Sequence, residues 1–295
     1  MRRTIVSAAL FVCGCASATG PSTETRPCNP LAGWADVAQA SVGKYLIFGE
    51  THGTREGPLA VQEFVCQVAT RPVLLAVEID SSRNDELQSA WQANDETSVG
   101  LPEALRDMLV NRSDGVGSQA MVDMIVKLQA LKSSGADIDI VAFNGARDNE
   151  QAKRFEYLPG QEPHEAAQAE NIRLAAAKRQ YRHVVVLAGS VHGQKSPVKV
   201  GDVTFEPMAM KLGLASDVVS MRMETAGGAA WNCRMKPGGP PLDRPIVHSD
   251  LDCSAHPLTG TARSEPVMTL AETESRTFDG YYFVGPVSAS PPAAP

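Results

Sequence analysis

Hydrophobic and polar positions alternate along the chain in blocks that predict strands and helices in turn. Short apolar runs predict strands at residues 45–48, 73–80, 138–143, 184–189, 218–223 and 278–284. Amphipathic or helix-favouring segments predict helices at residues 59–70, 84–93, 101–110, 119–133, 163–181 and 207–214. Strands joined through helices are typical of βαβ units. We therefore expect an α/β fold with a mostly parallel central sheet and helices on both of its faces.

Three of these strands end in residues that can carry chemistry. Glu50 and His52 follow the first strand, and residues two apart in an extended chain point to the same side. Glu78 lies near the end of the second strand, and His192 follows a later strand in a Gly-x-x-His sequence. Taken alone, Glu50 and His52 could equally be a polar strand end that caps the next helix. Three such strand ends favour a common site at one edge of the sheet, where open α/β sheets place their ligands.

The order of these motifs resembles the erythromycin esterase/ChaN-like superfamily, whose relatives include the Tiki and TraB proteins. The resemblance rests on Gly49-Glu50-Thr51-His52, Glu78 and Gly189-Ser-Val-His192, and it extends from about residue 45 to residue 192. It implies hydrolases of macrolide esters, metal-dependent proteases or haem-binding lipoproteins. It also assigns the site to Glu50, His52, Glu78 and His192. ChaN-like members carry a second histidine soon after the first, whereas this chain has Arg55 and Glu56 there.

Two imidazoles and two carboxylates permit two routes to hydrolysis of an ester or amide bond. Glu50, His52, Glu78 and His192 could bind a divalent metal that activates a water molecule. Without a metal, His52 could take the proton of the water while His192 stabilises developing charge. The sequence does not choose between the routes. The alternative from another class is a haem- or metal-binding lipoprotein without catalysis, with Tyr45 or Tyr157 as an aromatic haem ligand.

Three further residues are candidates for substrate binding. Arg55 lies in the loop after the first strand, and Arg112 lies in the polar, glycine-containing loop at residues 111–117. Asn144 ends the strand at residues 138–143. Ordinary surface charges and backbone-satisfying turns remain the alternatives for these positions. We expect a small-molecule or peptide substrate.

The helix at residues 163–181 contains a second resemblance. The run from Gln168 to Ile172 is similar to the Met-Ala-x-Asn-Ile run of many superfamily members, which often have an arginine four residues before the methionine. His164 stands at that position here. We expect His164 to be solvated at the start of the helix, and His183 to be exposed before its strand.

Composition narrows the class of protein. The chain has 295 residues, 43% hydrophobic content and a formal net charge of −7, and it contains no basic block. These values suit one large globular domain and make nucleic acid an unlikely partner. The chain has no Gly-x-Ser-x-Gly elbow, no phosphate-binding glycine loop, no zincin motif and no C-x-x-C-H haem attachment sequence.

The two ends of the chain predict export and a flexible tail. Residues 1–15 have the charged start and short apolar run of a signal peptide, and Cys15 ends a sequence that resembles a lipoprotein cleavage box. A cut after Ala16-Ser17-Ala18 is the competing possibility. We expect a tether at residues 16–30, one α/β domain at residues 31–287, and a disordered tail at residues 288–295. The protein is then expected on the periplasmic side of a bacterial cell envelope, anchored to the membrane through Cys15.

The four remaining cysteines predict two disulfides in an exported chain. Cys28, Cys66, Cys233 and Cys253 allow three pairings. We favour Cys28 with Cys66, which fixes the N-terminal segment, and Cys233 with Cys253. The second bridge would close a Gly/Pro-rich insertion at residues 226–266, and it would stabilise the protein by about 3 kcal/mol on the chain-entropy estimate.

Overall fold

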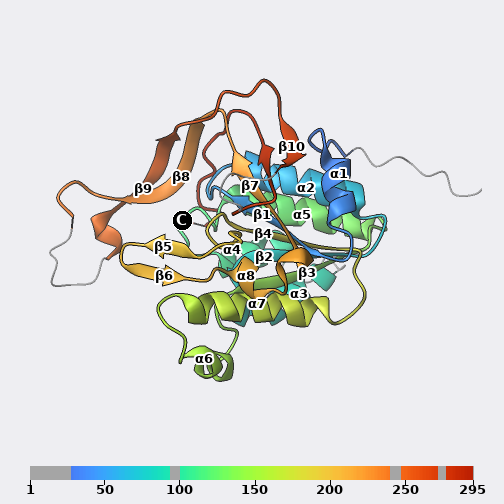
Figure 1. Ribbon diagram of the computed structural model, residues 1–295, viewed down its shortest axis with the longest axis horizontal. Helices are drawn as coiled ribbons and strands as arrows, with labels where there is room; N and C mark the ends of the chain where they lie inside the picture. The colour runs from blue at the N-terminus through green and yellow to red at the C-terminus, as the bar shows by residue number, and fades with distance from the viewer. Residues whose placement is uncertain (1–27, 94–99, 240–246, 272–276, 295) are drawn as a thin grey trace, which may run out of the picture.

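A seven-stranded sheet forms the centre of the protein (Figure 1). The computed structural model describes residues 28–93, 100–239, 247–271 and 277–294. The strand order is β10-β11-β7-β1-β4-β2-β3. All neighbouring strands are parallel except β10 and β11, which confirms the expected mostly parallel sheet. The strands are β1 (Tyr45–Glu50), β2 (Val73–Asp80), β3 (Ile138–Asn144), β4 (His183–Gly189), β7 (Val218–Glu224), β10 (Val267–Leu270) and β11 (Gly280–Phe283).

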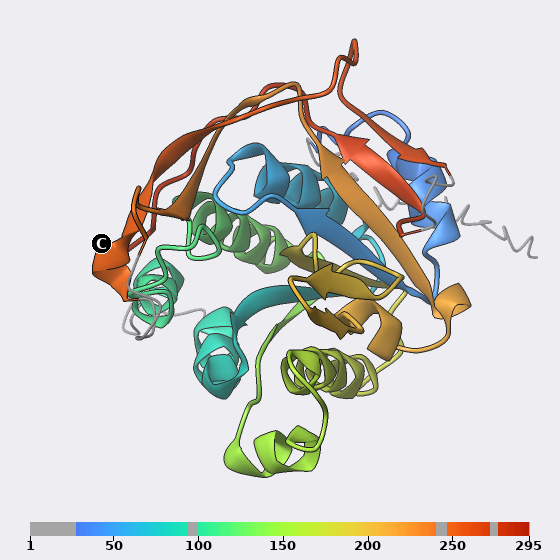
Figure 2. The same cartoon turned by 60° about the vertical axis from the view of Figure 1, so that its left-hand side comes forward.

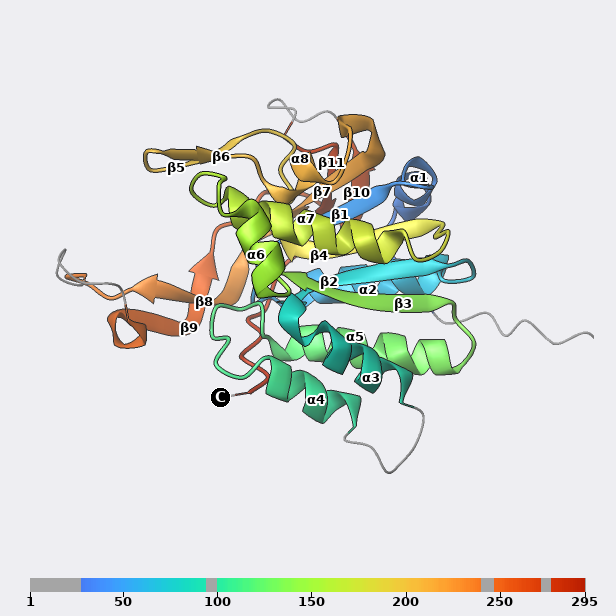
Figure 3. The same cartoon turned by 90° about the horizontal axis from the view of Figure 1, so that it is seen from below.

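Helices cover both faces of this sheet (Figure 2). Leu46 and Phe48 of β1 pack into the core under one helical layer, and Ile47 between them packs into the core under the other. The first layer contains α1 (Trp34–Ala40), α2 (Glu56–Val68), α3 (Asn84–Gln92), α4 (Leu101–Met108) and α5 (Gln119–Ser133). On the opposite face lie α7 (Glu162–Ala176) and α8 (Met208–Lys211), with α6 (Asn149–Phe155) packed against α7 (Figure 3). Strands buried on both faces explain the nearly continuous apolar runs of the sequence.

The strand order explains why the site residues meet. β4 lies between β1 and β2 and is parallel to both. The carboxyl ends of these three strands therefore share one edge of the sheet. Glu50 pairs with Gly189 at that edge. The pairing of β2 with β3 shifts register between Val77 and Asp80, in the stretch that contains Glu78.

Both predicted disulfides are present. Cys28 is bonded to Cys66, and Cys233 is bonded to Cys253. The second bond joins directly opposed residues of an antiparallel hairpin made by β8 (Gly228–Met235) and β9 (Leu251–Leu258). The predicted Gly/Pro-rich insertion therefore contains a β-hairpin that is closed by a disulfide and projects beyond the main sheet (Figure 1).

Several short elements escaped the sequence pattern. A second hairpin consists of β5 (Val198–Val200) and β6 (Val203–Phe205), and its three-residue strands are too short to show a period. The sequence pattern also did not predict α1, α6, β10 and the 3-10 turns η1 (Ser81–Arg83), η2 (Ala215–Asp217) and η3 (His248–Asp250).

Two expectations from the sequence are wrong, one about the exposure of His183 and one about the disorder of the C-terminal segment. His183 begins β4 and is buried, and its Nδ1 lies 3.3 Å from the hydroxyl of Ser41. Residues 288–294 do not form a free tail, because their backbone pairs with two loops. The amide of Ser290 donates to the carbonyl of Gly53, and the amide of Ala293 donates to the carbonyl of Gly117. The expected signal peptide, and the tether up to residue 27, lie outside the described residues.

Candidate functional site

The first strand delivers a glutamate and a histidine that contact each other. Glu50 is the last residue of β1 and is 3% exposed. The side chain of His52 folds back beside it, and Nδ1–H of His52 donates to Oε1 of Glu50 at 2.9 Å. A carboxylate can only accept, so this bond leaves Nε2 of His52 as the free ring nitrogen. Glu50 thus fixes both the orientation and the tautomer of His52.

The end of β4 supplies the second histidine in a matching arrangement. The chain turns after Gly189, where the amide of His192 donates to the carbonyl of Gly189. Nδ1–H of His192 lies 2.9 Å from both oxygens of Glu165, a buried residue in the first turn of α7. Oε2 of Glu165 also accepts from the amide of Met208. The second imidazole is therefore held in the same way as the first, with Nε2 free.

Glu78 lies between the two free ring nitrogens. Its Oε2 is 3.6 Å from Nε2 of His52, and its Oε1 is 3.7 Å from Nε2 of His192. Glu78 is 4% exposed and is held by a hydrogen bond from the amide of Gly189 to Oε2. Both distances to the imidazoles exceed a direct hydrogen bond, and such spacing suits a shared water molecule. The structure thus brings together Glu50, His52, Glu78 and His192, as the sequence predicted.

These carboxylates control the protonation of the imidazoles. Burial lowers the pKa of His52, but the charge of Glu78 and the hydrogen bond to Glu50 outweigh burial and raise the pKa from 6.5 to about 9. Burial also opposes the charge of His192, and the hydrogen bond to Glu165 and the charge of Glu78 raise its pKa overall. Both histidines are therefore biased towards the imidazolium form.

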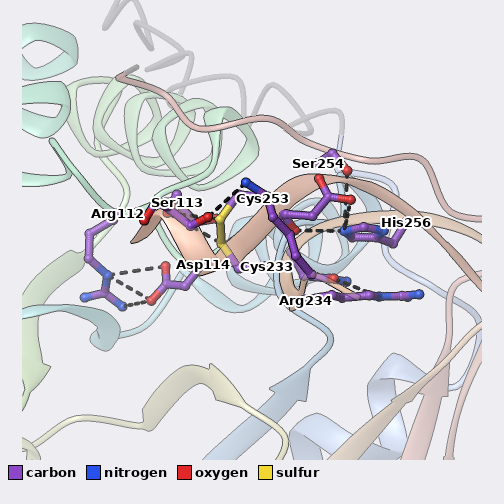
Figure 4. The surroundings of a disulfide bond; sticks show 12 residues. Arg112, Ser113, Asp114, Cys233, Arg234, Cys253, Ser254 and His256 are labelled. Carbon is purple, nitrogen blue, oxygen red and sulfur yellow. Dashed lines mark hydrogen bonds and ion pairs between the residues drawn. A yellow bond between two sulfur atoms is a disulfide. The ribbon is translucent and has the colours of Figure 1, made fainter. Parts of the chain in front are cut away.

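A loop and the disulfide-bonded hairpin lie against this centre. Arg112 forms an ion pair with Asp114, and the charge of Asp114 contributes to the raised pKa of His52. Ser113 stands between these two residues in the sequence and contacts the disulfide. Sγ of Cys233 lies 3.2 Å from the carbonyl oxygen of Ser113 (Figure 4). The loop at residues 111–117 thus borders the site and is backed by the disulfide.

The same hairpin packs against the loop that carries His52. Gly53 has φ of +72°, and a Cβ there would lie 1.9 Å from the carbonyl oxygen of Trp231 in β8. The amide of Trp231 donates to the carbonyl of Gly53. A residue with a side chain at position 53 would therefore be strained and would displace β8.

The three predicted substrate-binding residues occupy different positions. Asn144 ends β3, and its Oδ1 accepts a hydrogen bond from Gln168, which also contacts His164. Arg112 borders the site in its ion pair. Arg55 has an exposed side chain, and its backbone amide donates to the carbonyl of Ser288.

His164 is not simply solvated at the start of α7, as the sequence suggested. Its Nε2 lies 2.9 Å from Nε2 of Gln168, and its ring centroid lies 6.0 Å from that of His192. Burial lowers the pKa of His164, and the positive charge of His192 lowers it further. These effects favour the neutral imidazole at His164, whereas His192 beside it is biased towards the imidazolium form.

Glu165, which contacts Nδ1 of His192, is a member of this cluster that the sequence did not predict. A glutamate in the first turn of a helix is ordinarily explained by the helix dipole, and Glu165 is not among the predicted site residues. Glu165, Gln168 and Asn171 are all buried and recur every third residue of α7. A polar stripe on the buried face of a helix was the available signal, because buried polar side chains need specific partners.

The haem and metal hypotheses can be compared with the geometry. Tyr45 begins β1, at the opposite end from Glu50, and Tyr157 is 77% exposed. Neither tyrosine belongs to the cluster. As the side chains stand, the described residues contain no group of three or more His, Cys, Asp or Glu arranged to hold a metal ion.

Comparison with known proteins identifies the fold. No family model matches the sequence, and no curated protein sequence matches it. A solved succinoglycan biosynthesis protein is similar, with a TM-score of 0.60 and 10% identity over 90% of this chain and 95% of that one. A mutant of erythromycin esterase EreC in its open conformation is also similar, with a TM-score of 0.57 and 11% identity over 87% of this chain and 94% of that one. A solved protein from Bacillus cereus has a TM-score of 0.55 and 12% identity over 90% of this chain and 94% of that one. The chain therefore shares its fold with erythromycin esterase EreC and with these two other solved proteins.

Proposed function

We propose that this protein is a hydrolase that cleaves an ester or amide bond with a paired-histidine site. The observation that carries the proposal is the continuous row Glu50–His52, Glu78 and His192–Glu165, in which two oriented imidazoles face one buried carboxylate. An oriented base next to a second charged group is the arrangement that water activation requires. The likeness in fold to an esterase agrees with this reaction class.

The two imidazoles have separate roles in the proposed reaction. A water molecule sits between the imidazoles and Glu78, and the neutral form of His52 accepts its proton at Nε2 as the oxygen attacks the substrate carbonyl. Glu50 stabilises the imidazolium that forms. The Nε2–H of charged His192, held by Glu165, donates to the oxygen that becomes negative in the tetrahedral intermediate. The proton on His52 then passes to the leaving alcohol or amine.

A screen of the purified protein tests the proposal. Neutral p-nitrophenyl esters and short peptides would be assayed with and without a chelator, and the metal content of the protein would be measured beforehand. We expect ester hydrolysis that survives the chelator. Activity restored only by an added divalent ion would instead assign His52, Glu78 and His192 to metal binding. No turnover, together with a stoichiometric haemin Soret shift that is lost on replacing His52, would favour the haem-binding alternative.

The pH dependence of kcat/KM should report the raised pKa of His52. The base must be neutral, and it holds its proton up to a pH of about 9, so kcat/KM should rise about tenfold per pH unit from pH 7 towards pH 9. It should fall again where His192, whose pKa is also raised, loses the proton that it donates. In Glu78→Gln the rising limb should move to lower pH, because removing a negative charge destabilises the imidazolium. A limb that does not move in Glu78→Gln would contradict this assignment.

The position of the protein in the cell forms a separate part of the proposal. The two disulfides indicate an extracytoplasmic protein. Among the described residues, none of the helices is long and apolar enough to cross a membrane. We infer that residues 1–15 are a signal peptide and that acylated Cys15 anchors the protein on the periplasmic side of the envelope, with a substrate taken from that compartment.

Replacing Cys15 tests the anchor. Cys15→Ala should move the protein from the membrane fraction to the soluble fraction, because the acyl chains are lost with the thiol. Fractionation followed by detection of the protein gives the measurement, with Cys13→Ala as the matched control. Equal membrane association of both variants would rule out lipidation at Cys15.

A further inference from the structure

A cavity of about 510 Å³ lies beside His192. Glu165 and His164 of α7 form one part of its wall, and Val191 and His192 follow β4. Val203 and Phe205 of β6 are also among its lining residues. Of the two histidines in the proposed mechanism, it is His192 that borders this space. A group held here would therefore lie next to the side chain that contacts the reacting carbonyl oxygen.

The β5–β6 hairpin places apolar side chains around the cavity. Phe205 is 4% exposed and anchors the hairpin, whereas Val203 is 46% exposed and Val191 is 40% exposed. Figure 3 shows this hairpin beside the first turns of α7. Isolated apolar side chains on a surface are ordinary, but these residues line one concavity beside a charged imidazole. Such a surface gains free energy when an apolar group covers it.

The charges around the cavity are already matched. Both oxygens of Glu165 are engaged by His192, and one also accepts from the amide of Met208. Nearby, Nζ of Lys211 donates hydrogen bonds to Oε2 of Glu162 at 3.0 Å and to Oε2 of Glu206 at 3.1 Å. The charge of His192 is balanced by the carboxylates of Glu165 and Glu78. A charged ligand group would therefore lose its hydration beside two carboxylates and one imidazolium without gaining an unpaired partner of opposite charge, and that loss is costly.

We propose that this cavity binds an uncharged, mainly apolar group of the substrate, attached next to the bond that is cleaved. The proposal rests on the proposed hydrolase function and specifies its substrate class as esters or amides with a bulky neutral acyl group. The volume falls in the usual range for small-molecule sites, roughly 300–1,000 Å³. Val203 sets the space available, and His164, held by Gln168, supplies a hydrogen-bonding group at the polar end.

A binding experiment tests the cavity without requiring hydrolysis. The neutral probe N-phenyl-1-naphthylamine would be titrated into the full protein and followed by fluorescence. Its sulfonated analogue, 8-anilino-1-naphthalenesulfonate, has the same ring system with a negative charge. We expect saturable binding of the neutral probe and at least tenfold weaker binding of the sulfonate. Equal or tighter binding of the sulfonate would overturn the proposal.

Two substitutions assign the binding to this cavity. Val203→Trp should fill the space and weaken binding of the neutral probe at least tenfold, whereas Leu214→Trp, at a site 73% exposed, should leave it unchanged. Val203→Ala shortens the side chain and enlarges the cavity, and it keeps the test valid if the tryptophan variant fails to fold. It should increase the preference for larger probes. Unchanged binding in a folded Val203→Trp variant would place the probe elsewhere and overturn the proposal.

Kinetics then connect the cavity with catalysis. The ratio of kcat/KM for p-nitrophenyl benzoate to that for the acetate should fall at least tenfold in Val203→Trp and should keep its wild-type value in Leu214→Trp. An equal loss for both esters would contradict a role in acyl recognition. If the wild-type protein hydrolyses neither ester, the proposed function fails, and the probe titration still decides whether the cavity takes a neutral apolar group.

Discussion

Replacing His52 with alanine should lower kcat/KM at least a hundredfold, because the water molecule loses its proton acceptor and general-base catalysis typically contributes about 10²–10⁴-fold. His192→Ala should cost a similar factor through loss of the donor to the developing oxyanion. The double variant should lose little more than the worse single variant, since groups that act as one unit are not additive. Ester hydrolysis by each variant at pH 9 gives the measurement.

The control for this experiment follows from the structure. His183 is buried against Ser41, so His183→Ala would disturb the core. His256 lies on β9, outside the row of site side chains, and His256→Ala should keep wild-type activity. All variants should still unfold cooperatively, although His52→Ala should lower the melting temperature by a few degrees because Glu50 and Glu78 lose their cationic partner. A His256→Ala protein as inactive as His52→Ala would show that the assay responds to folding.

The sequence was sufficient for the parts of the site that depend on strand ends. Glu50 and His52 follow a strand that is apolar throughout, and the period of two puts both side chains on one side. Glu78 lies near the end of a second apolar run, and His192 follows a third. The sequence alone could not show that β4 lies between β1 and β2, because strand order comes from tertiary packing. The convergence was an inference from the general behaviour of parallel sheets, and the geometry agrees with it.

The rest of the site depends on contacts between distant segments. Glu165 reaches His192 across 27 residues of sequence, and a first-turn glutamate gives no local sign of such a partner. His183 looked exposed because it precedes an apolar run, yet the strand begins with it.

The C-terminal segment shows the same limit. Residues 288–294 are rich in proline and small residues, which indicated disorder. Their order comes from backbone pairing with the loops at Gly53 and Gly117, and side-chain composition does not encode that pairing. The segment covers the loop that carries His52, so the predicted tail belongs to the framework of the site.

Gly189 joins the two halves of the site, and its replacement is expected to be as damaging as the loss of a histidine. A Cβ at position 189 would lie 2.5 Å from Nε2 of His52. The backbone there has little freedom to move, because Gly189 pairs with Glu50 in the sheet and its amide donates to Glu78. The imidazole of His52 must therefore move, and its hydrogen bond to Glu50 must stretch or break.

Gly189→Ala should accordingly lower kcat/KM about a hundredfold, since a displacement of about 1 Å in a reacting group can cost that much. The melting temperature should change by only a few degrees, because the ring can swing towards solvent. An NMR titration of the imidazole should show the pKa of His52 falling from about 9 towards 6.5 as the ring leaves the two carboxylates. Gly100→Ala is the matched control, since a Cβ there meets only ordinary contact, 3.6 Å from Cδ of Pro102. Full activity in Gly189→Ala would show that His52 does not occupy this position during catalysis, and the proposed base would then have to be reassigned.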